Sequence, residues 1–209
     1  MEFRLIYQGL LPSTGNKSRP EEAQAIRQAF HPQLRRLWSV KHGLQELAAA
    51  KGQSAAAKDK EFYDSLNLSW SETGIVAIGK QWNKGGFNFV PLVTPGVTVR
   101  CALDILLLRA EEKKYIFHRG DIDGQLATLF DALSMPQHAE QIFPEQIKPD
   151  ENPMFCLLQN DNLISEVRVV SDELLVLPGE RDVKPDDAFA VVHVKLNHYG
   201  SFPFDRWFD

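Results

Sequence analysis

The most informative stretch of the chain is residues 120–133, which read GDIDGQLATLFDAL. Its apolar side chains recur at intervals of three and four, which predicts a helix over 121–134 with one buried face. These side chains are Ile122, Leu126, Leu129, Phe130 and Leu133. Asp121 and Asp123 stand at the start of the helix. Acids are favoured there as caps and by the helix dipole, and a carboxylate pair fixed by a buried helix is also able to hold a divalent cation.

A second informative segment lies about forty residues further on. The polar run QNDN at 159–162 leads into LISEVRVV at 163–170, whose alternation and β-branched residues predict a strand. Together the two segments resemble the RusA family of Holliday-junction resolvases. That family has an Asp-x-Asp-Asn-x-x-Lys-x-x-Leu-Asp-Ala-Leu helix and a later Asp-Asp pair before a strand. The matching positions are 121–123, 129–133, Asp161, Leu163 and Ile164.

The resemblance implies a metal-dependent endonuclease that acts on branched DNA of the Holliday-junction type. It also implies a homodimer, because cutting two strands symmetrically requires two sites. Asp121, Asp123 and Asp161 are then the expected catalytic and metal-binding residues, with Mg²⁺ or Mn²⁺ as the cofactor. Such a cation polarises a phosphoryl oxygen, activates a water and shields the leaving oxygen. This expectation requires Asp161 to meet the other two aspartates in space.

Three positions depart from the family pattern. Gly124 stands where the family has Asn, Ala127 where it has Lys, and Asn160 where it has the first late Asp. Loss of the Lys removes a cation that stabilises charge developing during phosphodiester cleavage, and loss of the Asp weakens metal binding. The alternative is therefore a catalytically inactive RusA-fold protein that binds nucleic acid or a protein partner.

The net charge of −5 is unevenly distributed over the 209 residues. Residues 17–60 hold nine Lys and Arg against four Asp and Glu, whereas residues 117–187 hold five against fifteen. A basic arm that grips phosphates and an acidic centre that needs metal are compatible with this asymmetry, as are two ordinary solvated faces. The candidate nucleic-acid contacts are Arg35, Arg36, Lys41, Lys80, Lys84 and Arg119. A third hypothesis is an interaction protein that works through the basic helices and the aromatic tail at 199–208.

The order of predicted elements indicates an α+β (or α/β) single domain, 1–209, with a mixed sheet on which the helix at 121–134 packs. An N-terminal helical insertion is expected at 20–60, broken at Pro32, and a long Pro-rich connection, a lid or an insertion, at 136–153. The predicted strands are 2–8, 75–78, 87–93, 97–109, 154–158, 163–170 and 188–196.

Other classes of protein find little support in the sequence. No apolar run approaches the roughly 20 residues that a membrane span needs, and the N-terminus reads as a strand rather than a signal peptide, so we expect a cytoplasmic protein without membrane contact. Cys101 and Cys156 lie in apolar runs and are expected to be buried thiols. The histidines lack zinc-type spacing, and no phosphate-loop or nucleophile-elbow motif occurs.

Overall fold

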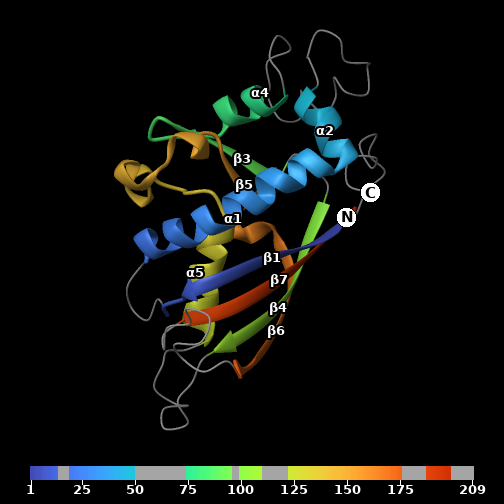
Figure 1. Cartoon of the computed structure of the whole chain (residues 1–209). Helices are drawn as coiled ribbons and strands as arrows, with labels where there is room; N and C mark the ends of the chain where they lie inside the picture. The colour runs from blue at the N-terminus through green and yellow to red at the C-terminus, as the bar shows by residue number, and fades with distance from the viewer. Residues whose placement is uncertain (14–18, 50–73, 96–98, 110–121, 176–186, 199–209) are drawn as a thin grey trace.

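The computed structural model describes residues 1–13, 19–49, 74–95, 99–109, 122–175 and 187–198. Figure 1 shows helices and strands mixed along the chain, which confirms the predicted α+β class. The helices are α1 (Pro20–Val40), α2 (His42–Ala49), α4 (Gly74–Gln81) and α5 (Ile122–Leu133). The strands are β1 (Glu2–Leu10), β2 (Asn83–Lys84), β3 (Phe87–Val93), β4 (Val99–Arg109), β5 (Met154–Leu158), β6 (Ile164–Glu173) and β7 (Asp187–His198). Short 3-10 helices are η2 (Ala139–Gln141), η3 (Pro144–Gln146), η4 (Pro149–Glu151) and η5 (Asp161–Leu163).

The described strands form two mixed sheets, where the sequence led us to expect one. The larger sheet has the order β1-β7-β4-β6, and the smaller has the order β2-β3-β5. In the larger sheet β4 runs parallel to β6 and antiparallel to β7. In the smaller sheet β3 runs parallel to β5 and antiparallel to β2. Every residue of β5 is buried, as expected for a parallel strand covered on both faces.

Strand β4 is central in the larger sheet, as its apolar sequence predicted. Leu103, Ile105 and Leu107 alternate along it and are buried in the main core. The side chain of Asp104 lies between them in sequence and so points to the other face. It forms an ion pair with Lys195 of β7. Asp104 therefore faces away from the core and pairs within the sheet.

Helix α1 continues through Pro32, so the predicted break there is wrong. A proline inside a helix costs about 3 kcal/mol, but the turns on either side bury Phe30 and Leu34, each worth about 1.5–3 kcal/mol. Burial therefore outweighs the lost hydrogen bond. The helix instead ends at Val40. The next residue, Lys41, has an extended backbone and donates its N–H to the carbonyl of Leu37.

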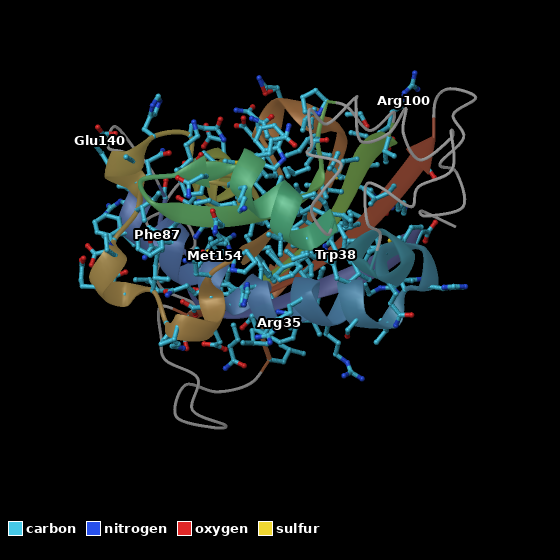
Figure 2. All side chains as sticks on the ribbon, turned by 90° about the horizontal axis from the view of Figure 1, so that it is seen from above. Arg35, Trp38, Phe87, Arg100, Glu140 and Met154 are labelled. Atoms are coloured by element: carbon cyan, nitrogen blue, oxygen red, sulfur yellow. The ribbon has the colours of Figure 1, made fainter. Side chains whose placement is uncertain are left out.

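The N-terminal helical segment is part of the core rather than an arm added to it. Phe30 of α1 meets Tyr7 of β1 with ring centroids 6.1 Å apart, and Trp38 meets Phe155 of β5 at 6.0 Å. Figure 2 shows Trp38 among the side chains packed between α1 and the strands, with Arg35 on the outside. Helix α1 thus contacts a strand of each sheet, while 50–60 lies outside the described residues.

The predicted strand at 75–78 is a helix, α4. A four-residue apolar run does not reveal its own period. Ile75, Ile78 and Trp82 all contact the same core cluster, and a strand would direct Ile75 and Ile78 to opposite faces. Helical spacing of three and four residues is what lets all three side chains reach that core.

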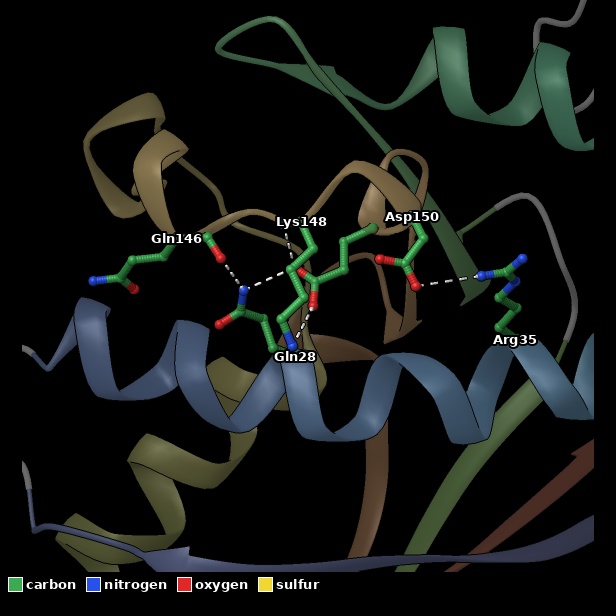
Figure 3. A network of polar contacts seen from close by, with 6 residues as sticks. Gln28, Arg35, Gln146, Lys148 and Asp150 are labelled. Atoms are coloured by element: carbon green, nitrogen blue, oxygen red, sulfur yellow. Dashed lines mark hydrogen bonds and ion pairs between the residues drawn. The ribbon is translucent and has the colours of Figure 1, made fainter.

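The Pro-rich connection at 136–153 forms η2, η3 and η4 and is fastened to α1. Gln28 donates to the carbonyl of Gln146 at 2.6 Å and to the carboxylate of Glu151 at 2.8 Å (Figure 3). The Glu151 carboxylate also accepts the backbone N–H of Lys148. Gln24 exchanges two hydrogen bonds with the backbone of Phe143. These contacts hold the connection against one side of α1.

Candidate functional site

The acidic motif begins α5, and only part of it lies in the described structure. Asp123 occupies the first turn of the helix, where its Oδ1 accepts the backbone N–H of Gly124 at 2.8 Å. Such a bond satisfies one of the free donors at a helix start. Asp121 and Arg119 lie outside the described residues.

The later acidic position, Asp161, begins η5 directly before β6. The turn is shaped by Asn160, whose Oδ1 accepts the backbone N–H of Asn162 at 3.0 Å. This is the ordinary capping role of an Asn side chain. The residue that replaces the family's first late Asp therefore stabilises the turn that presents Asp161.

Asp161 lies beside Asp131, near the end of α5. The two side chains line one pocket, and the charge of Asp161 acts on Asp131. Asp123 is eight residues before Asp131, a separation of about 12 Å along a helix axis. The structure thus brings Asp161 to the far end of the motif helix from Asp123. Within the described residues no three His, Cys, Asp or Glu side chains converge on a metal position, and the role of Asp121 stays a prediction.

The pocket beside Asp131 and Asp161 is small and polar. Its volume is about 30 Å³, enough for a water or two, or for a small ion. It lies where α1 packs against α5, and residues of η2 and η5 complete its lining. The lining residues are Pro20, Ala23, Arg27, Asp131, Ser134, Met135, Gln137, Gln141, Asn160 and Asp161.

Arg27 is the cation of this pocket and is only 3% exposed. Its Nε donates to the carbonyl of Ser134 at 2.7 Å and its Nη2 to the carbonyl of Asp131 at 2.6 Å. A helix leaves its last carbonyls unpaired, so the guanidinium caps the end of α5. Nη1 is buried without a hydrogen-bond partner among the described residues. Burial lowers the pKa of Arg27, an effect that Cys156 and Asp131 partly offset.

Asp131 has a raised pKa, first because it is partly buried and second because Asp161 repels its charge; Arg27 acts in the opposite direction. Two carboxylates that repel each other at one pocket are suited to a cation or to a shared proton. Carboxylate and amide oxygens are the donors that Mg²⁺ and Ca²⁺ prefer. Asp131, Asp161 and the side-chain amides of the pocket are therefore chemically suited to hold such an ion.

Sequence reasoning missed both Arg27 and Asp131. The resemblance implied no metal-binding role for Asp131, although this residue lies within the matched LFDAL run. Arg27 carried a detectable signal, because it lies on the apolar stripe of α1, between Ile26 and Phe30, at core spacing. A charged residue on a buried stripe is almost never found without partners. What the sequence did not reveal was that its partners are the last carbonyls of α5.

The candidate nucleic-acid contacts fall on two separate parts of the structure. Arg35 and Arg36 are exposed on α1, and Lys41 follows that helix half-buried. Arg35 lies 3.8 Å from Asp150 with both side chains more than half exposed, which is a weak pair in water. Lys80 is exposed on α4 and Lys84 half-buried in β2. All five remain predicted contacts.

No protein-family model, curated protein or solved structure matches this chain. The resemblance to the RusA family therefore rests on the motif positions alone. Within the described ranges, no helix combines the length and apolar character required to span a bilayer.

Proposed function

We propose that this protein is a RusA-like, metal-dependent endonuclease acting on branched DNA, with Mg²⁺ or Mn²⁺ as cofactor, and that it works as a cytoplasmic homodimer. The observation that carries the proposal is that Asp131 and Asp161, two acids whose charges repel each other, line one small pocket. A divalent cation relieves that repulsion. It also supplies the Lewis acid that phosphodiester hydrolysis needs.

Each residue of the pocket has a part in this proposal. Asp161 and Asp131 contribute carboxylate oxygens to the cation. Arg27 holds the end of α5, and with it Asp131, in place through its two carbonyl contacts. Asp123 lies about 12 Å from Asp131 along the helix axis and therefore does not bind the same cation. Asp121 remains a proposed acid at the start of the helix. The basic residues of α1 and α4 are proposed to contact the DNA backbone.

The second candidate is a RusA-fold protein that binds nucleic acid or a protein without cutting. The pocket volume favours it, because about 30 Å³ admits an ion but not a nucleotide. The replacements Gly124, Ala127 and Asn160 favour it as well, since they remove a cation and a carboxylate from the family pattern.

Cleavage of a four-way DNA junction in Mg²⁺ or Mn²⁺ tests the proposal. We expect Asp161→Asn and Asp131→Asn to reduce cleavage at least about a hundredfold. The matched control is Asp150→Asn, an exposed acid on η4, which should cleave like the wild type. If Asp123→Asn lost cleavage and Asp131→Asn kept full cleavage, the catalytic site would lie at the start of α5 instead.

Binding measured on the same junction separates the two candidates. Junction binding without cleavage in either metal would select the non-catalytic alternative. Absence of both binding and cleavage would overturn the nuclease and would leave only a protein partner for the second candidate. Isothermal titration with Mg²⁺ or Mn²⁺ alone should give one site in the wild type and none in Asp161→Asn.

A further inference from the structure

The two edges of the larger sheet differ in whether their backbone is protected. At the β1 edge, Gln33 of α1 accepts the backbone N–H of Ile6 at 2.9 Å and donates to its carbonyl at 2.7 Å. This side chain occupies the edge as a further strand would. Unprotected edges are sites where another chain adds by β-pairing, and proteins protect them in such ways.

The other edge is β6, which pairs with β4 alone among the described strands. It is ten residues long, and most of its side chains are exposed. Val167 lies opposite Leu103 of β4, so both face the core side of the sheet. Leu103 is buried, yet Val167 remains 41% exposed. On the core side of the sheet, the apolar side chain of Val167 is therefore left partly uncovered at β6.

We propose that β6 pairs antiparallel with β6 of a second copy of this chain, joining two four-stranded sheets into one. Directly opposed residues of two antiparallel strands have their side chains on the same face of the sheet. When a twofold axis relates the two strands, one residue must therefore lie opposite the same residue of the other copy. With Val167 at the axis, Glu166 lies opposite Arg168 of the other copy, and the pair occurs twice. The two valines meet on the core side and cover each other.

Charge complementarity selects this register over its neighbours. An axis at Arg168 sets two guanidinium groups against each other, and an axis at Val169 sets Glu166 opposite Asp172. An axis at Val170 pairs Arg168 with Asp172 but places Val167 opposite Glu173. Opposite charges across strands stabilise and like charges destabilise. The axis at Val167 alone satisfies both the charged and the apolar residues.

This inference locates the contact of the homodimer proposed above, and it does not depend on phosphodiester chemistry. A dimer without nuclease activity would leave it standing and overturn the proposed function. A monomeric nuclease would overturn this inference and the homodimer, and it would leave the proposed nuclease activity standing.

Sedimentation equilibrium of the full chain over a range of concentrations tests the pairing. Arg168→Glu and Glu166→Arg should each weaken the dimer about tenfold or more, because two attractive pairs become repulsive. The double variant E166R/R168E should restore dimerisation, since the exchanged charges are again complementary. Arg4→Glu is the matched control, an exposed Arg on the same face of the sheet at the β1 edge. Circular dichroism confirms that each variant folds.

Cross-linking tests the register independently. Val167→Cys should give a covalent dimer with a short bismaleimide, while Val170→Cys should react far less. The native Cys101 and Cys156 are buried and do not compete. A wild type that stays monomeric at every concentration would overturn the proposal. So would a dimer indifferent to both charge reversals, or one cross-linked through position 170 rather than 167.

Discussion

Arg27 Nε lies 2.7 Å from the carbonyl oxygen of Ser134, just past the end of α5, although 107 residues separate them in the chain. Together with the bond from Nη2 to the carbonyl of Asp131, this contact ties α1 to α5. It also fixes the carboxylate of Asp131 at the pocket that Asp161 enters. The stability of the fold and the geometry of the site therefore depend on the same guanidinium.

Arg27→Met should destabilise the protein by about 2–4 kcal/mol, because it leaves two buried carbonyls without donors. The measurement is the free energy of unfolding in urea. Arg35→Met on the same helix is the control, and it should cost no more than about 0.5 kcal/mol, since its partner Asp150 is equally exposed. Equal losses in the two variants would show that the cap contributes nothing beyond an exposed arginine.

Asp131→Asn should stabilise the metal-free protein at pH 7.5, raising Tm by about 1–3 °C. The pKa of Asp131 is raised by burial and by Asp161, so its ionisation opposes folding as the pH rises through the folded pKa. The gain should therefore vanish near pH 3.8, the ordinary Asp pKa. Mg²⁺ should reverse the order by stabilising only the wild type. Thermal scans with and without Mg²⁺ check both effects, and a variant less stable than the wild type in metal-free buffer would contradict the first.

His31 should make the protein less stable in mild acid. It is buried, and its Nδ1 accepts the backbone N–H of Phe155 at 3.0 Å. Burial lowers its pKa below 6.5, although Glu151 and the backbone of Asp150 partly offset this. The unfolded state therefore binds the proton first, and stability is lost as pH falls below about 6.5.

Urea unfolding of His31→Gln between pH 7.5 and pH 5.5 checks this dependence. The variant should lose less stability over that range than the wild type. His138→Gln is the control. His138 is exposed and directly precedes η2, so this variant should behave like the wild type. Parallel curves for all three proteins would exclude His31 as a source of the pH dependence.

Both thiols should be inert in the folded protein. Burial raises the pKa of Cys101 to about 12 and that of Cys156 to about 12, so neither forms the reactive thiolate at neutral pH. Ellman's reagent should react with two thiols in urea and at least about a hundredfold more slowly without it. Val40→Cys, at a position 54% exposed, supplies the exposed reference thiol. Fast reaction of either native thiol under folding conditions would contradict its burial.

Periodicity within single segments was enough to predict α5, β4, β6 and most of the other strands. It failed at α4, where four apolar residues are too few to show a period. The rule that proline breaks a helix failed at Pro32, because contacts with Tyr7 and Phe155 stabilise α1 around the proline and these residues are remote in sequence. A local rule for proline does not include such burial.

The amino-acid sequence was enough to predict which face of each long element is buried and that acids stand at the start of α5 and before β6. Only the packing of remote segments brings Asp161 and Asp131 to one pocket, places Arg27 at the end of α5, and leaves β6 paired with β4 alone among the described strands. The physical reason is that side-chain periodicity specifies how an element is oriented toward the core. It does not specify which other element it meets there, since that depends on how remote segments cross.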